Sequence, residues 1–196
     1  MFMPFKTLVL KTFRGSDRAR WKSEANLEKE WEPRTDQIAK WIPKGSRVIE
    51  FGSGKQMLKS KLDEGCVYVG SDFVKRNADT FLCDLNKKPL PDLAQFAPEV
   101  AVFSGVLEYV HDLPGIAAWL ASQVRICIFS YSCLEPSGKF LGSIRAAARR
   151  LSNGWVNTFT EAEITAIFQG AGFRVLEKDN WEYQRLFMLE KQSIAQ

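Results

Sequence analysis

The sequence predicts an α/β fold, with a doubly wound, mostly parallel sheet of seven strands and helices on both faces. Two observations predict it. Five short apolar runs alternate with helix-compatible stretches, and they lie at residues 47–51, 66–72, 80–84, 100–104 and 124–130. Strands that are apolar throughout and alternate with helices are typical of parallel sheets covered on both faces. Two further runs, 173–177 and 185–190, can pair as an antiparallel hairpin at the edge of the sheet.

Length and composition fit a single domain over residues 1–196. Hydrophobic residues make up 45% of the 196 residues, which suffices for one core and leaves little room for a second. No apolar run approaches the roughly 20 residues of a membrane span, and residues 1–13 lack the features of a secretory signal. We therefore expect a soluble, cytoplasmic protein without a membrane span.

The cysteines do not indicate a metal centre or a disulfide framework. Cys66, Cys83, Cys127 and Cys133 form no C-x-x-C pair. Most of them lie in apolar runs, where a reduced thiol acts as a small hydrophobic side chain. We expect no metal ion.

Helices and loops connect the predicted strands. An N-terminal helical cap, residues 1–45, includes a helix-compatible stretch over 24–42 with a break or restart at Pro33. Later helices are expected over residues 55–62, 113–122 and 161–170, and Thr158 or Thr160 is the expected cap of the last one.

Gly52 and Gly54 separate the first strand from the helix expected over 55–62. Glycines let a ligand approach the backbone closely. The following helix would direct its unpaired N–H groups and the positive end of its dipole at a bound anion. We therefore expect a ligand with a carboxylate or phosphate at this loop.

Two aspartates end neighbouring strands, at the edge where open α/β sheets bind ligands. Asp72 ends the second strand, where an acidic side chain can accept hydrogen bonds from ribose hydroxyls. Asp84 ends the third strand and could bind the exocyclic amine of an adenine. A dinucleotide loop needs a third glycine at the position of Met57, so the pattern does not favour a nicotinamide or flavin cofactor.

The segment Glu50-Phe51-Gly52-Ser53-Gly54 resembles the Glu/Asp-x-Gly-x-Gly signature of class I S-adenosylmethionine-dependent methyltransferases, which have a Rossmann-like fold. The resemblance implies that S-adenosylmethionine is the cofactor and S-adenosylhomocysteine the product. It also implies that the loop faces the methionine part of the cofactor, so that a carboxylate here lies near a cationic ligand.

The resemblance extends over most of the chain. Tyr68–Asp72 is similar to the family's ribose-binding strand, Cys83–Asn86 to its adenine-contacting segment, and Phe103–Tyr109 to the fourth-strand motif of its small-molecule branch. Residues 171–173 and the terminal hairpin resemble the family's ending, in which the last strand is reversed. The cofactor-binding residues that the resemblance implies are Glu50, Gly52, Ser53, Gly54, Asp72, Phe73, Asp84, Leu85 and Ser104.

Two positions depart from the family's pattern. Gln56 stands where a third loop glycine is usual, which narrows the space beside the amino-acid part of the cofactor. Tyr109 follows Glu108, where this branch often has a histidine, so no histidine base carries over to that position.

Methyl transfer from a sulfonium is an in-line displacement with an activated donor, so the protein mainly supplies alignment and exclusion of water. A hydroxyl acceptor would be helped by a general base near the methyl group. His111, which follows the fourth strand, is one catalytic candidate, or else an exposed residue before a helix that Asp112 caps. Tyr109 is the other candidate, and it either positions the acceptor or only packs.

The expected partner is a small-molecule acceptor, whose pocket is covered by the N-terminal cap and by an insertion over residues 134–158, as in similar enzymes. Arg145, Arg149 and Arg150 can share one side of a helix, where they either bind an anionic acceptor or form a solvated basic face. The residues do not distinguish a sugar, a lipid-linked or another biosynthetic intermediate, or O- from N-methylation. They also leave the oligomeric state open.

Two alternatives differ in class from a small-molecule enzyme. Gln56 and the lack of a clear base also fit a methyltransferase-like binding or scaffold subunit without turnover. The basic N-terminus would suit a nucleic-acid methyltransferase. However, the Asn/Asp-Pro-Pro-Tyr/Phe signature of that class is missing, and Ser104-Gly105-Val106-Leu107 stands in its place. Nucleic acid is therefore not the expected partner.

Overall fold

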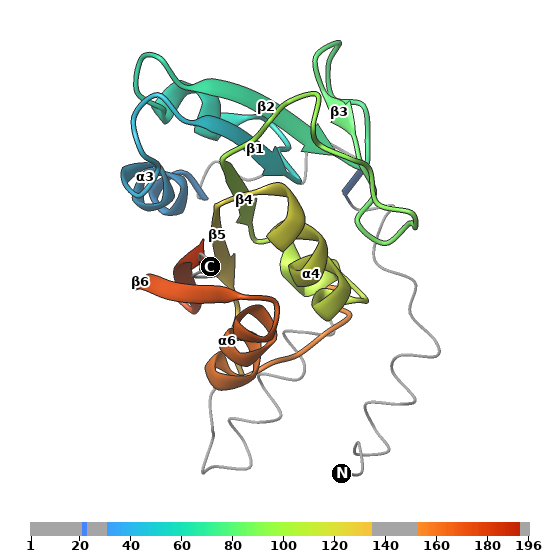
Figure 1. Cartoon of the computed structure of the whole chain (residues 1–196), viewed down its shortest axis with the longest axis vertical. Coiled ribbons are helices and arrows are strands. Elements are labelled where there is room, and N and C mark those ends of the chain that lie inside the picture. The colour runs from blue at the N-terminus through green and yellow to red at the C-terminus, as the bar shows by residue number, and fades with distance from the viewer. Residues whose placement is uncertain (1–20, 23–30, 135–152, 193–196) are drawn as a thin grey trace.

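The computed structural model describes residues 21–22, 31–134 and 153–192, arranged as Figure 1 shows. Seven strands form one sheet in the order β3-β2-β1-β4-β5-β7-β6. Their bounds are β1 (Arg47–Phe51), β2 (Val67–Asp72), β3 (Phe81–Leu82), β4 (Val100–Ser104), β5 (Ile126–Tyr131), β6 (Phe173–Trp181) and β7 (Gln184–Lys191). Strands β1 to β5 pair in parallel, whereas β7 is antiparallel to both β5 and β6. The predicted doubly wound, mostly parallel sheet with a reversed last strand is confirmed.

Helices cover both faces of this sheet, as predicted, and they are α3 (Glu32–Lys40), α4 (Leu113–Gln123) and α6 (Glu161–Gly170). Ile38 of α3 packs in one core cluster with Val102 and Ile128 of the sheet. Ile116 of α4 and Phe168 of α6 belong to a second cluster. Strand side chains alternate between the two clusters because successive residues point to opposite faces. Figure 1 shows α3 and α4 on opposite sides of β4.

The terminal strands differ from the prediction in extent and place. Strand β3 covers only residues 81–82 of the expected 80–84, and β6 extends four residues beyond 177 to Trp181, with a register shift between Val175 and Glu177. Strand β7 lies inside the sheet, so of the two hairpin strands only β6 forms an edge. Leu186, Phe187 and Leu189 of β7 are fully or almost fully buried, which explains why this strand pairs on both sides.

Local signals fix where the helices begin. Pro33 lies in the first turn of α3, so it marks a start and not a break. Asp112 caps α4 by accepting a hydrogen bond from Gly115 N at 2.9 Å. Thr160 Oγ1 accepts from Glu163 N at 3.2 Å, and the Glu163 carboxylate accepts from Thr160 N at 2.8 Å. This reciprocal pair is a capping box at the start of α6. No helix in the described parts of the chain is long and apolar enough to cross a membrane.

The two sequence-predicted caps of α6 allow a matched test. Thr160→Ala removes the acceptor for Glu163 N, and we expect it to lower the free energy of unfolding by about 1 kcal/mol. Thr158 is exposed and its hydroxyl bonds only to the neighbouring Asn157 carbonyl, so Thr158→Ala should leave stability nearly unchanged. Denaturant unfolding measures both variants, and equal losses would contradict the assignment of the cap.

Candidate ligand-binding site

Two adjoining cavities lie at the carboxyl ends of β1, β2 and β4. The large cavity has a volume of about 240 Å³ and the small cavity about 80 Å³. Five of their lining residues are common to both cavities, and these are Trp21, Gly52, Phe73, Val106 and Tyr109. The two cavities therefore form one site with a shared wall, at the edge where open parallel sheets bind ligands.

The structure brings most of the sequence-predicted ligand residues to this site. Gly52, Asp72, Phe73 and Ser104 line the large cavity, and Gly52 and Phe73 also line the small one. Asp84 and Leu85 line the small cavity. The remaining three, Glu50, Ser53 and Gly54, line neither of the two cavities.

The segment after the glycine loop is not the helix predicted over 55–62. It forms one short 3₁₀ helix, η3 (Met57–Lys61). Gln56 precedes it in the left-handed conformation, with a φ of 57°, which interrupts any right-handed helix. The few peptide dipoles of such a short 3₁₀ helix add up to little. The helix dipole on which the predicted anion site relied is therefore weak here, and an anion at this loop stays a prediction.

Two residues of the loop nevertheless have backbone conformations that glycine favours. Gly52 has a φ of 66°, and a Cβ at this position would lie 2.5 Å from Cγ2 of Val106 in the shared wall. Gln56 keeps a positive φ where the third glycine is usual. Its amide packs against Gly70, where a Cβ would lie 2.7 Å from Nε2. The loop thus follows the path of a glycine loop although a glutamine occupies that position.

Asp72 is buried and largely satisfied by the protein itself. Its Oδ2 accepts hydrogen bonds from Gly54 N at 3.2 Å and from Arg76 Nε at 3.1 Å, and its Oδ1 accepts from Val74 N at 3.1 Å. Arg76 also donates to the carbonyl of Trp21. A carboxylate offers about four acceptor positions, so about one remains for a ligand. Asp72 is therefore joined through Arg76 to the Trp21 backbone, and the Trp21 ring lies in the shared wall.

Glu50 lies in β1, just before the loop, and lines neither cavity. Its side chain is buried, and its Oε2 accepts a hydrogen bond from the Tyr68 hydroxyl at 2.5 Å. Burial raises the pKa of Glu50 to about 7, against the hydrogen bond from Tyr68, which lowers it. The side chain of the first motif residue is thus bound to β2 through Tyr68.

Arg34 of α3 is a site residue that the sequence did not reveal. It lines the large cavity and only 5% of it is exposed. Its Nη1 donates to Gln184 Oε1 at 2.8 Å and its Nη2 donates to the Ser104 carbonyl at 3.4 Å, while Nε has no partner. Burial lowers the pKa of Arg34. Its partners lie 70 and 150 residues away, so local patterns carry no signal for it.

Glu108 is the second such residue. The sequence motif includes it, but gave it no role. Its side chain is buried and lines the large cavity. Oε1 accepts from Ser132 N at 2.9 Å and from Gln184 Nε2 at 3.4 Å, whereas Oε2 has no partner. Burial raises the pKa of Glu108. An unpartnered buried carboxylate oxygen is rare in proteins and calls for an explanation, such as a catalytic role or a bound water.

The two catalytic candidates lie in different surroundings. Tyr109 lines both cavities, and its hydroxyl accepts a hydrogen bond from Trp155 Nε1 at 3.1 Å. The edge of its ring meets Trp21, with centroids 5.5 Å apart. His111 is exposed and lines neither cavity, and its backbone N–H donates to Asn86 Oδ1 at 2.8 Å. The structure brings Tyr109 to the site and leaves His111 outside it.

Parts of the predicted cap and insertion also reach the large cavity. Trp21, Trp31 and Arg34 come from the N-terminal segment, and Asn153 and Trp155 come from the end of the insertion. The basic residues Arg145, Arg149 and Arg150 lie outside the described residues. The four cysteines form no disulfide with one another. In the described ranges, no group of three His, Cys, Asp or Glu side chains could hold a metal ion.

Comparisons with known proteins agree with this architecture. The family model described as a methyltransferase domain matches residues 23–178 of the chain. No curated protein matches the sequence.

Several solved structures share the fold at low sequence identity. The mitomycin 7-O-methyltransferase MmcR has a TM-score of 0.66 at 14% identity, over 95% of this chain and 60% of that one. Human N-acetylserotonin methyltransferase in complex with SAM has a TM-score of 0.68 at 15% identity, over 97% and 61%. A putative methyltransferase from Haloferax volcanii, in complex with a methyltransferase activator, has a TM-score of 0.68 at 13% identity, over 92% and 97%. This chain thus spans about three fifths of the first two proteins, and the likeness is one of fold.

The buried Glu50 predicts a pH-dependent stability. Because the folded state raises its pKa from 4.5 to about 7, its contribution to stability is full below pH 4.5 and is lost as the pH rises to about 7. Between about pH 4 and pH 8, wild type should lose up to about 3 kcal/mol of unfolding free energy relative to Glu50→Gln. Denaturant unfolding across this range measures the difference, and parallel pH profiles would contradict it.

Proposed function

The chain belongs to the methyltransferase domain family, and we propose that it transfers the methyl group of S-adenosylmethionine to an oxygen or nitrogen atom of a small molecule. The product of the cofactor would be S-adenosylhomocysteine. The observation that carries the proposal is the pair of adjoining cavities at the carboxyl ends of β1, β2 and β4. Methyl transfer needs a donor and an acceptor side by side, and the shared wall supports that arrangement.

The residues of the two cavities fit the parts of this cofactor. Asp84 and Leu85 would hold the adenine in the small cavity, and Asp72 keeps about one acceptor position for a ribose hydroxyl. Gly52 leaves free the space beside Val106 that a Cβ would fill. From there the amino-acid part would extend into the large cavity toward Ser104, whose buried Oγ lacks a partner. The human neighbour in complex with SAM supports this choice of cofactor.

The cofactor, when bound, supplies a methyl group that its sulfonium has already activated. What this chain adds is alignment of the acceptor with that methyl group and exclusion of water. Trp21 and Tyr109 stand where the two cavities meet, and the ring of Trp21 packs against both Trp31 and Tyr109. These rings line the junction of the two cavities on one side.

Aromatic side chains dominate the acceptor side of the large cavity, where Trp31, Trp155 and Tyr183 join the shared residues. Their flat apolar faces favour a planar acceptor. Glu108 then takes the role for which His111 was a candidate. Its unpartnered Oε2 would accept the proton that the acceptor hydroxyl or amine loses as the methyl group is transferred.

The two alternative functions receive less support. The scaffold reading rested on Gln56 and on a missing base, but Gln56 retains the glycine-like φ and Glu108 supplies a carboxylate in the cavity wall. The nucleic-acid reading rested on basic residues of the N-terminus, most of which lie outside the described ranges. The binding and turnover experiments below separate all three.

Calorimetric titration with S-adenosylhomocysteine tests the cofactor. We expect the folded wild type to bind it with micromolar affinity. Gly52→Ala should weaken binding at least about tenfold, because the new Cβ is strained at a φ of 66° and meets Val106. Gly170→Ala is the matched control, since a Cβ there meets nothing within 4 Å. No binding by the folded wild type would overturn the proposed function.

Glu108→Gln tests the proton acceptor, because glutamine keeps an oxygen for Ser132 N but cannot take the proton. With an acceptor found by screening phenols, amines and sugars, we expect turnover to fall at least about 100-fold. The affinity for S-adenosylhomocysteine should stay within about twofold of wild type. Since burial raises the pKa of Glu108, the wild-type rate should rise with pH through that raised value, and the variant should lack this rise.

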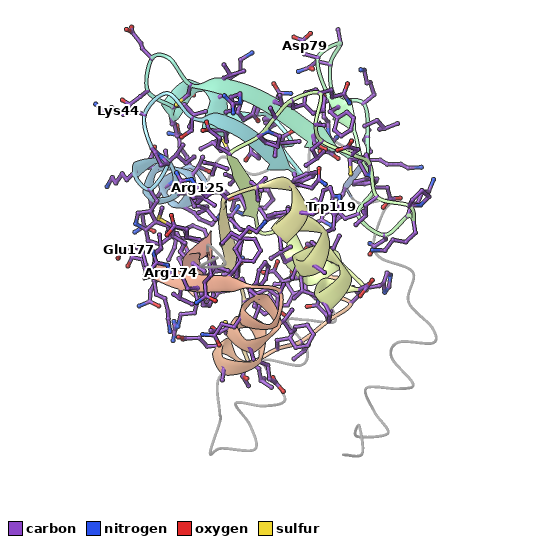
Figure 2. All side chains as sticks on the ribbon, viewed as in Figure 1. Lys44, Asp79, Trp119, Arg125, Arg174 and Glu177 are labelled. Atoms are coloured by element: carbon purple, nitrogen blue, oxygen red, sulfur yellow. The ribbon has the colours of Figure 1, made fainter. Side chains whose placement is uncertain are left out.

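Glu177→Gln, an exposed carboxylate labelled in Figure 2, is the control for the loss of one negative charge and should behave like wild type. A Glu108→Gln variant with the turnover and pH profile of wild type would remove Glu108 from the reaction.

A further inference from the structure

Arg34 carries a buried positive charge with no direct ion-pair partner in the described part of the chain. No Asp or Glu side chain of the described residues lies within ion-pair distance of its guanidinium. Glu108, Glu50 and Glu182 act on its charge from farther away than such a contact. Arginine stays protonated in proteins, and burying an unpaired charge is unfavourable. The position therefore favours a ligand that brings the missing negative charge.

The guanidinium is held in one orientation. It lies over the rings of Trp31 and Trp181, with its Cζ 5.5 and 5.3 Å from their centroids. Gln184 holds Nη1, and the contact of Nη2 with the Ser104 carbonyl is long, at 3.4 Å. Nε has no partner at all. The Nε–Nη2 edge therefore has donors to spare, and this is an edge with which arginine can bind a carboxylate through two parallel hydrogen bonds.

The fold keeps room for this group. Gly105 has a φ of 70°, and a Cβ there would lie 2.8 Å from Nη1 of Arg34. A larger residue at position 105 would be strained and would push the guanidinium away from the cavity wall. The strand end therefore admits the arginine close to Ser104.

The glycine loop supplies little positive potential to a bound anion. In the usual strand, loop and helix arrangement, the start of a helix supplies positive potential to a bound anion. Here η3 is a single short 3₁₀ helix that Gln56 precedes in a left-handed conformation. Two arginines line the large cavity, and Arg76 pairs with Asp72. Arg34 is therefore the lining residue whose positive charge no carboxylate pairs directly.

We propose that Arg34, held by Gln184, forms a carboxylate-binding subsite in the large cavity. Two sources can supply this carboxylate, and both rest on the proposed function. One is the amino-acid part of the cofactor, which would extend from Gly52 toward Ser104. The other is an acid group on the acceptor.

Calorimetry with two cofactor fragments distinguishes the sources. S-adenosylhomocysteine and 5′-methylthioadenosine share the adenosine and the thioether, but only the first carries the amino acid. If the cofactor supplies the carboxylate, Arg34→Gln should lower the affinity for S-adenosylhomocysteine at least about tenfold and leave the affinity for 5′-methylthioadenosine unchanged. If the acceptor supplies it, the variant should bind both compounds with the affinity of wild type. Benzoate, but not benzamide, should then bind to the protein saturated with S-adenosylhomocysteine, and Arg34→Gln should abolish that binding.

A second variant keeps the charge and moves it. Gly105→Ala retains Arg34 but displaces its guanidinium, so it should reproduce the selective loss that Arg34→Gln shows. Arg174→Gln is the control for the loss of one positive charge. Arg174, labelled in Figure 2, is exposed, pairs with Glu190 and lines neither cavity. Thermal unfolding identifies any variant that fails to fold. If Arg34→Gln or Gly105→Ala fails to fold, the other of the two tests the carboxylate subsite.

Two results have different meanings. In the first, wild type binds S-adenosylhomocysteine while Arg34→Gln and Gly105→Ala leave the affinities for both adenosine compounds and for benzoate unchanged. That result would overturn the carboxylate subsite and leave the proposed function standing. If the folded wild type binds neither fragment, the proposed function fails. The benzoate titration, made on the protein without cofactor, then still decides whether Arg34 binds a carboxylate.

Discussion

The burial of the central strands on both faces is the constraint on which the rest of this structure depends. Strand β5 is buried along its whole length, and β1 and β4 are buried except at one end. Such strands have no place for a polar side chain that must meet a ligand. Polar groups therefore gather where the strands end, and Asp72, Ser104 and the loop at Gly52 meet there in one site. The same burial requires the strands to be apolar in sequence. The feature that places polar groups at the strand ends therefore also allows the strands to be predicted from the sequence.

Much of the fold could be predicted because its signals are local. The apolar runs gave the strands, and Asp112 and Thr160 marked the starts of two helices through their own side chains. The helix expected after the glycine loop was wrong for a reason that no periodicity reveals. Gln56 adopts a left-handed backbone, and its amide packs against Gly70 of the neighbouring strand. That conformation is a tertiary outcome, since nothing in the residue type demands it.

The site divides along the same line. Gly52, Asp72 and the pair Asp84 and Leu85 follow strands directly, so their position in the chain predicts their position in space. Arg34 and Glu108 both contact Gln184 of the last strand, a long-range arrangement that sequence order cannot foresee. His111 shows the converse. It stands two residues after Tyr109, yet its backbone N–H donates to Asn86 and the residue is exposed.

A series of contacts also connects two sides of the large cavity. Arg76 donates to Asp72 with its Nε and to the carbonyls of Trp21 and Lys22 with its other nitrogens. Trp21 in turn packs against Tyr109, whose hydroxyl holds Trp155. A carboxylate on one side of the site is thus joined, through the Trp21 backbone and one ring contact, to the aromatic wall on the other. The hydrogen bonds of this series hold their partners in place, because breaking one leaves a buried polar atom without a partner. The position of Trp21 is therefore set by Arg76 on the Asp72 side as well as by Tyr109 on the other.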